Sequence, residues 1–321
     1  MKTLLTLLCC CLLLVGLAFG AARLGLIPPQ VYTWLDEAFG GSAEETSQEG
    51  NSVSSDPVVS DAVQIADEQE LAAVLAGALL NFEDAISAQT AIPGGADYGV
   101  YLADLTENAY SVLRRDYPEL FWVGMGQYGI QWDGAAEPAA VSFSITMDYA
   151  YTPQAAGEVE AEINQVVGAI LSGAPANNYE AAKYFHDWII DNTVYDTAVA
   201  ESGNTAGAEH AYNINGVFLN GKAVCEAYAK SFQFLCDRYG ISCRTVFGTS
   251  EGERHAWNYV QLDGNWYLVD CTADDPVGDQ DVLRWDYFLK GLDGTADEMR
   301  IGDIYREDSG NYPALSTRDY S

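Results

Sequence analysis

Hydrophobic positions after residue 225 recur at helical spacing. Four apolar or aromatic side chains follow Cys225 on one face, namely Tyr228, Phe232, Leu235 and Tyr239. Gly240 stands where a helix of this length would end. Residues three, seven and eleven positions apart share a helix face, so Cys225 belongs to the apolar face. The pattern therefore predicts a helix with Cys225 in its first turn and the sulfur facing the core.

Further along the chain, alternating polar and apolar positions predict a β-hairpin. Residues 259–262 and 266–269 flank Asp263-Gly264, a two-residue turn signal. With this turn, residue 262 pairs with 265 and residue 257 with 270. Side chains on a strand alternate between faces, so His255 and Asp270 share a face as diagonal neighbours. A register slip of one residue would turn the Asp270 carboxylate away.

A thiol, an imidazole and a carboxylate in this order are the parts of an activated cysteine nucleophile. Cys225, His255 and Asp270 are therefore the candidate catalytic residues. The N-terminus of a helix favours negative charge and hence a thiolate. Lys222 is expected to support the thiolate and Glu226 to oppose it.

The same segments resemble the transglutaminase-like superfamily. Its bacterial members carry a Gly-Lys-x-Val-Cys-x-Gly-Tyr-Ala helix start, a His-Ala-Trp-Asn strand and a Val-Asp-x-Thr-Trp-Asp-Asp-Pro strand. Here the corresponding stretches begin at Gly221, His255 and Val269. The resemblance covers about residues 175–290 in order and spacing. It departs from the family pattern at three positions, which are Ala227 for glycine, Ala273 for tryptophan and Asn215 for tyrosine.

The resemblance implies an α+β fold with a papain-like or transglutaminase-like core, in which the nucleophile-bearing helix packs on an antiparallel sheet. It implies that Cys225 is the nucleophile, His255 the base and Asp270 the group that orients the base. A thioester on Cys225 then passes to water or to an amine. We expect hydrolysis of a peptide or isopeptide amide, without a cofactor or metal. Transamidation and a non-catalytic binding module are the alternatives, and the three departures leave the oxyanion-site side chain unassigned.

Composition narrows the partners. The 321 residues are 49% hydrophobic and include seven tryptophans, enough for a sizeable core. The formal net charge of −32 argues against nucleic acid and anionic lipid surfaces, which both bind basic footprints. The expected substrate is a peptide or protein, including one linked to a cell wall.

The N-terminus predicts export. Met1-Lys2 and the apolar run Leu4–Phe19 fit a signal peptide or an uncleaved signal anchor over residues 1–27. Residues 28–60 read as a flexible acidic linker. The expected location is extracytoplasmic, either secreted or tethered to a membrane by this segment.

Residues 61–172 predict a smaller α+β extension before the catalytic core at 173–290. Its expected helices are 70–88, 102–115 and 155–171, and its expected strands are 120–123, 127–132 and 141–149. Residues 291–321 read as a polar tail with no assigned element.

The remaining candidate ligands form no recognisable site in the sequence. Cys236 and Cys243 flank Gly240, which leaves a disulfide between them open, and no paired spacing supports zinc. The acidic stretch 274–281 lacks the position pattern of a calcium loop, so an acidic turn is expected. His186 and His210 are assigned no chemistry.

Overall fold

The computed structural model describes residues 62–132, 140–202, 207–275, 283–296, 299–308 and 311–321. These described residues belong to one compact unit. The expected signal segment at 1–27 and linker at 28–60 lie outside the described residues. Among the helices that are described, none has the length and apolar character needed to cross a membrane. The expectation of an extracytoplasmic protein tethered by its N-terminal segment is therefore corrected: nothing in the described chain supports it.

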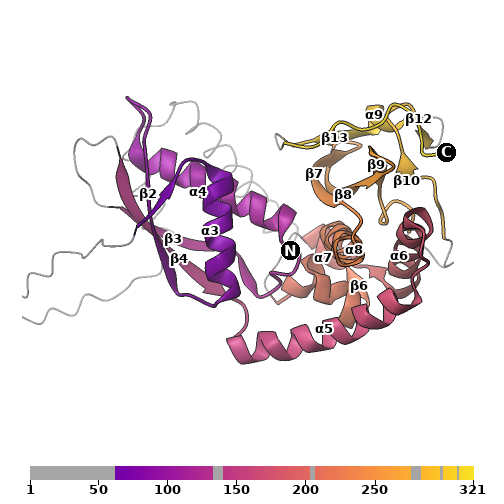
Figure 1. Ribbon diagram of the computed structural model, residues 1–321, viewed down its shortest axis with the longest axis horizontal. Coiled ribbons are helices and arrows are strands. Elements are labelled where there is room, and N and C mark those ends of the chain that lie inside the picture. The colour runs from indigo at the N-terminus through magenta and orange to yellow at the C-terminus, as the bar shows by residue number, and fades with distance from the viewer. Residues whose placement is uncertain (1–61, 133–139, 203–206, 276–282, 297–298, 309–310) are drawn as a thin grey trace, which may run out of the picture. The chain divides into compact units, whose positions relative to one another are not determined.

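The first sheet belongs to the predicted extension. Its four strands lie in the order β1 (Val63–Ile65), β2 (Ala85–Thr90), β4 (Val141–Tyr149) and β3 (Val123–Trp132). Only the β1–β2 pairing is parallel. Two helices, α3 (Glu68–Leu80) and α4 (Tyr98–Asp116), pack against each other and against this sheet (Figure 1). Each begins at an aspartate, Asp67 or Asp97, whose carboxylate accepts backbone N–H groups of the first turn.

The helix expected over 70–88 is wrong in its second half. Helix α3 ends at Leu80, where Asn81 caps it and Phe82 takes a left-handed backbone with φ of 54°. The following residues of β2 alternate between exposed and buried positions, as a half-buried strand does. The short turn at 81–84 separates the apolar positions of helix α3 from those of strand β2, whereas the sequence pattern predicts one continuous helix.

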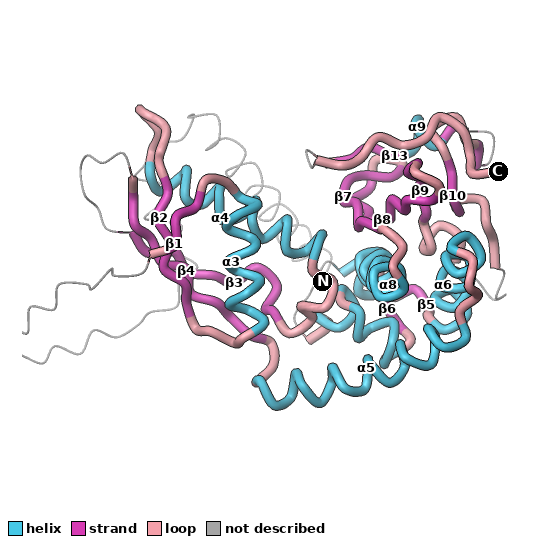
Figure 2. The backbone as a smooth tube through the Cα atoms, viewed as in Figure 1, coloured by secondary structure: helices cyan, strands magenta, loops and turns pink. Residues whose placement is uncertain are grey.

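Two helices lead from the first sheet to the core, α5 (Pro153–Gly173) and α6 (Asn178–Asn192), as the tube in Figure 2 shows. Thr152 caps α5 and Asn177 caps α6 through their side-chain oxygens. Proline at the first position of α5 has no N–H to leave unpaired and suits a helix start. The predicted helix 155–171 is thus confirmed.

The predicted nucleophile helix is confirmed as α8 (Cys225–Tyr239). Gly240 ends it in the left-handed conformation, with φ of 96°, and its N–H bonds back to Cys236 O at 2.9 Å. Eleven consecutive residues from Glu226 to Cys236 are buried, because α8 is covered by β7 (Cys243–Ser250), β8 (Glu253–Leu262) and α6.

The second sheet carries the predicted hairpin. Its strand order is β10 (Phe288–Lys290), β9 (Asn265–Val269), β8, β7 and β13 (Tyr305–Glu307), with every neighbouring pair antiparallel. Leu262 pairs with Asn265 and Asn258 with Val269, which is the predicted register. Asp263 and Gly264 have φ of 49° and 81°, as a type I′ turn requires. An α+β fold with a cysteine-bearing helix on an antiparallel sheet is therefore confirmed.

Short elements join α6 to α8 and build the C-terminus. Between α6 and α8 lie β5 (Val194–Tyr195), α7 (Thr197–Ser202), the turns η1 (Glu209–Tyr212) and η2 (Gly216–Asn220), and β6 (Lys222–Ala223). Residues 291–321, which the sequence left unassigned, contain β11 (Thr295–Ala296), β12 (Met299–Arg300), α9 (Ile301–Ile304) and β13. β13 forms the edge of the second sheet, so this segment is part of the folded unit.

Candidate active site

Cys225 is the first residue of α8 and is only partly buried. The other three cysteines in the described residues, Cys236, Cys243 and Cys271, are buried free thiols. Burial raises the pKa of Cys236 and that of Cys243, and the two thiols hydrogen-bond to each other rather than forming the disulfide that the sequence left open. Among these four thiols, Cys225 alone is placed to meet a substrate.

His255 lies on β8 and reaches the carboxylate that the register predicts. Its Nε2 is 2.6 Å from Asp270 Oδ2, with 16% of the His255 side chain exposed and 1% of the Asp270 side chain. Asp270 follows the last residue of β9, directly after the paired stretch. The hairpin thus brings these two predicted residues together.

The Asp270 carboxylate is fully occupied by donors. Its Oδ1 accepts the backbone N–H groups of Thr272 at 3.0 Å and Ala273 at 3.1 Å. Its Oδ2 accepts the hydroxyl of Tyr305 at 2.6 Å in addition to His255. A buried carboxylate is stable only with such partners. Tyr305 comes from β13, in the segment that the sequence left unassigned.

His255 is surrounded by groups that favour its cationic form. Burial alone favours the neutral ring, but attraction to Asp270 and the hydrogen bonds that the ring makes with Asp270 and Cys225 outweigh burial and raise the pKa of His255 to about 10. Burial likewise opposes the charge on Asp270, yet the charge and hydrogen bond of His255 lower the pKa of that carboxyl. At neutral pH the arrangement is an imidazolium between a carboxylate and the Cys225 sulfur.

The negative charge of Glu226, the residue after Cys225, is balanced by two cations, so it does not oppose a charge on the sulfur as the sequence suggested. Its carboxylate is 2.6 Å from Arg114 Nη2 and 2.8 Å from Lys230 Nζ. Burial would raise the pKa of Glu226, but the two cations overcome it and lower that pKa to about 2. Arg114 belongs to α4, so a helix far from Glu226 in sequence supplies a charge to this site. No local signal in the sequence links Arg114 to residue 226.

A second buried histidine supports the turn after Asp270. His186 on α6 is fully buried, with Nδ1 3.0 Å from Asp187 Oδ1 and Nε2 3.1 Å from Asp274 Oδ2. The N–H of Asp274 donates to Asp270 O at 3.2 Å. His186, which the sequence left without a role, thus ties α6 to the turn that follows Asp270.

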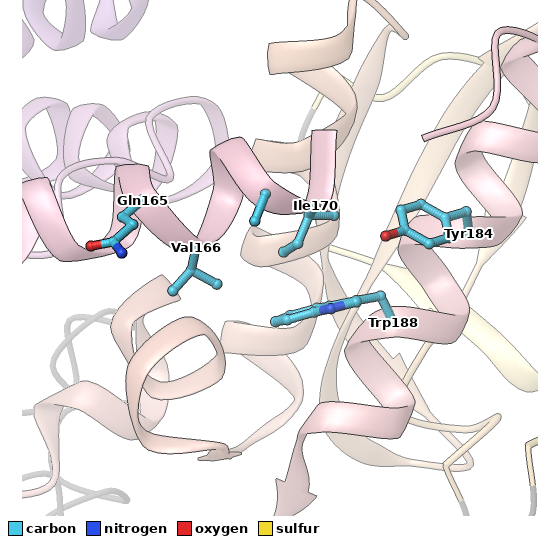
Figure 3. Close-up of a pocket in the computed structure, with 6 residues that line it drawn as sticks. Gln165, Val166, Ile170, Tyr184 and Trp188 are labelled. Atoms are coloured by element: carbon cyan, nitrogen blue, oxygen red, sulfur yellow. The ribbon is translucent and has the colours of Figure 1, made fainter. Parts of the chain in front are cut away.

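No metal site is found among the described residues, and the groove that is described lies apart from Cys225, His255 and Asp270. Residues 276–281 of the acidic stretch are not described, and the described residues contain no group of three or more His, Cys, Asp or Glu side chains suited to a metal. An open groove of about 470 Å³ lies between α5 and α6 (Figure 3). It is lined by Gln165, Val166, Ala169, Ile170, Tyr184 and Trp188. None of the three predicted catalytic residues lines it.

Comparison with known proteins agrees with this fold. Residues 165–271 match the family model of the transglutaminase-like superfamily, a range that includes Cys225, His255 and Asp270. The match identifies a transglutaminase-like domain over these residues, about a third of the chain.

Two curated relatives and one solved structure illustrate the likeness. The chain is 29% identical to kyphoscoliosis peptidase of Mus musculus over 126 residues. This match covers 36% of this chain and 18% of the relative. It is also 30% identical to kyphoscoliosis peptidase of Homo sapiens over 122 residues, a match that covers 34% of this chain and 18% of the relative. The chain thus spans less than a fifth of the length of these relatives. A crystal structure described as a TGase is 13% identical, with a TM-score of 0.35, over 62% of this chain and 53% of that one.

Proposed function

We propose that this protein is a thiol-dependent acyl-transfer enzyme that hydrolyses a peptide or isopeptide amide through a thioester on Cys225. The observation that carries the proposal is the placement of His255, whose Nε2 lies 2.6 Å from the Asp270 carboxylate and whose pKa is raised by the neighbouring Cys225 side chain as well as by Asp270. This chain of contacts ends at a partly exposed sulfur on the first turn of a helix.

The first half of the reaction forms the thioester. A cationic His255 beside the sulfur favours a thiolate, which attacks the carbonyl carbon of the amide. The carbonyl π electrons move to oxygen, and backbone N–H groups at the start of α8 face that developing charge. The intermediate collapses, the C–N bond breaks, and the leaving amine takes the proton of His255.

The second half returns the free thiol. The now neutral His255 removes a proton from water, and the resulting hydroxide attacks the thioester carbon and releases the acid and Cys225. Asp270 orients the imidazole in both halves through its Nε2 contact. Water needs no binding site of its own, whereas an amine acceptor does, and the curated relatives carry the name peptidase. We therefore favour hydrolysis over transamidation.

The test uses the purified chain with a glutamine-containing peptide in the presence and absence of hydroxylamine. Mass spectrometry then measures released acid or cleaved peptide against hydroxamate. We expect the acid or cleaved peptide to dominate and Cys225→Ala to abolish turnover. Cys271→Ala is the matched control, since that thiol is buried and its loss should leave turnover in the folded fraction intact.

Two outcomes would overturn the proposal in different ways. Hydroxamate as the main product at low amine concentration would identify a transamidase. Alkylation by iodoacetamide near neutral pH that is no faster at Cys225 than at an ordinary thiol of pKa about 8.5 would show that the thiol is not activated, which favours a binding module.

A further inference from the structure

A tyrosine from the C-terminal segment reaches the carboxylate that contacts His255. Tyr305 is the first residue of β13 and pairs with Ser250 of β7. Only 7% of its surface is exposed. Its ring packs edge-on against that of Trp257, with centroids 4.9 Å apart, and lies 6.2 Å from the His255 ring. Strand pairing and ring packing together fix the position of the Tyr305 hydroxyl.

The hydroxyl donates to the same carboxylate oxygen that His255 contacts. Tyr305 Oη and His255 Nε2 each lie 2.6 Å from Asp270 Oδ2. The backbone N–H groups of Thr272 and Ala273 hold the other oxygen, Oδ1. Of these four partners, only Tyr305 and His255 contribute side chains. Tyr305 therefore determines which lone pair of Oδ2 is left for the imidazole.

The phenol is the donor in this contact. Burial and the charge of Asp270 raise the pKa of Tyr305, so its hydroxyl keeps its proton. An ionised Asp270 can only accept hydrogen bonds. A donor on Oδ2 draws negative charge away from that oxygen and makes the carboxylate a weaker base. The proton between Oδ2 and His255 therefore stays on the nitrogen.

We infer that Tyr305 is a positioning residue of the active site, whose hydroxyl orients Asp270 and keeps the shared proton on His255. This inference rests on the proposed function, because it assigns a role within that reaction. With Nε2 held by Asp270, Nδ1 is the ring nitrogen left to exchange protons with the thiol, the leaving amine and water. A rotated carboxylate would turn Nδ1 away from these groups, and a displacement of about 1 Å can slow a reaction by about 10².

Hydrolysis of p-nitrophenyl acetate separates the two halves of the reaction. Acetylation of Cys225 expels p-nitrophenolate, which leaves without a proton from His255. Hydrolysis of the acetyl-enzyme requires His255 to take a proton from water, so it depends most on the position of the ring. In Tyr305→Phe we expect deacetylation to slow by about 10–100-fold and acetylation to slow less. Alkylation by iodoacetamide needs only the thiolate and should stay within about threefold of the wild-type rate.

A proton resonance provides a readout that a purely structural role would not move. The proton between His255 Nε2 and Asp270 Oδ2 is expected at low field in the NMR spectrum and is assigned by its loss in His255→Gln. In Tyr305→Phe it should move further downfield, because a more basic carboxylate draws the proton away from nitrogen. Site-specific 3-fluorotyrosine at position 305 is a more acidic phenol and a stronger donor, so it should move the resonance upfield.

Tyr312→Phe is the matched control. Tyr312 also lies in the C-terminal segment, but its hydroxyl accepts the backbone N–H of Phe247 at 3.1 Å. Its loss should leave both the deacetylation rate and the resonance unchanged. The 3-fluorotyrosine protein keeps the ring and the hydroxyl, so it tests the inference through the resonance even if Tyr305→Phe does not fold.

The outcomes separate this inference from the proposed function. A Tyr305→Phe protein that deacetylates at the wild-type rate, or a resonance that neither change at position 305 moves, overturns the positioning role. Equal losses of deacetylation and alkylation also overturn it, because they indicate general disruption of the site. A Cys225→Ala variant that still hydrolyses p-nitrophenyl acetate at the wild-type rate overturns the proposed function instead.

Discussion

At the scale of single residues, charge placement around one sulfur decides the chemistry. The Asp270 carboxylate is buried and carries four hydrogen bonds, from Thr272, Ala273, His255 and Tyr305. A carboxylate so well satisfied stays ionised and stabilises a cation at His255. The site therefore favours an imidazolium at His255, paired with the Asp270 carboxylate.

The titration of His255 tests this charge state. The chain has three histidines, so His255→Gln assigns the His255 ring signal by its disappearance. We expect an NMR midpoint about 10 in the wild type, and a lower midpoint in Asp270→Asn because the main group that raises the pKa is removed. A midpoint that stays the same in Asp270→Asn would contradict this account.

The raised pKa of His255 also determines how the free energy of unfolding changes with pH. The folded-state pKa of His255 lies above the unfolded value of about 6.5. The stabilisation is therefore complete below pH about 6.5 and is lost as pH rises towards about 10. Asp270→Asn should flatten this alkaline decline in the free energy of unfolding, measured by urea denaturation across that range.

Arg114 gives a second residue-scale prediction. Replacement by methionine keeps much of the side-chain length but leaves Glu226 with Lys230 as its remaining close cation. The less compensated carboxylate beside Cys225 repels a negatively charged sulfur, so alkylation of Cys225 at neutral pH should slow by about threefold. Stopped-flow alkylation measures it. Arg238→Met, which removes an arginine packed over Phe234 near the end of α8, should have no such effect.

At the scale of elements, local signals determined what the sequence could predict. The apolar stripe and Gly240 place α8, and Asp263-Gly264 fixes the hairpin register that brings His255 to Asp270. The boundary between α3 and β2 was missed because the turn at 81–84 contains neither glycine nor proline. The missed partners Arg114 and Tyr305 are distant in sequence from the residues they contact, so periodicity carries no information about them.

The C-terminal strand β13 provides an element-scale prediction. Tyr305→Phe removes the buried donor to Asp270 while keeping the ring that packs on Trp257 at a centroid distance of 4.9 Å. We expect a loss of about 1–3 kcal/mol in unfolding free energy, since a buried acceptor loses a partner. Reduced acylation of Cys225 should accompany it.

Tyr320→Phe is the matched control for that change. Tyr320 also belongs to the C-terminal segment and donates to a carboxylate, Asp263, at 2.7 Å, but that hydrogen bond is exposed. Its loss should cost only a few tenths of a kcal/mol, because water replaces the partner. Equal costs for the two variants would show that the Tyr305 contact has no special role.

At the scale of the whole molecule, one ionic cluster joins helices α4 and α8. Arg114 on α4 and Lys230 on α8 meet at Glu226, so two segments far apart in sequence are joined beside Cys225. The chain has a net charge of −32, and acidification towards its pI of about 4.1 reduces the repulsion among its carboxylates. Lowering the pH therefore reduces the overall repulsion between carboxylates, but it also protonates Glu226 and so weakens its ion pairs with Arg114 and Lys230.

Glu226→Gln separates the two effects. The pKa of Glu226 is lowered to about 2 by its cations against burial, so its stabilisation is complete above pH about 4.5 and is lost as pH falls towards 2. At pH 7 we expect the variant to be less stable by about 3 kcal/mol, because Lys230 remains buried without its carboxylate. The gap should narrow below pH about 4.5 and nearly vanish near pH 2, as urea unfolding at a series of pH values would measure.

Glu253→Gln, at an exposed position on β8, is the control and should parallel the wild type throughout. A gap of the same size at pH 7 and pH 2.5 would mean that shape, not charge, makes Glu226 important.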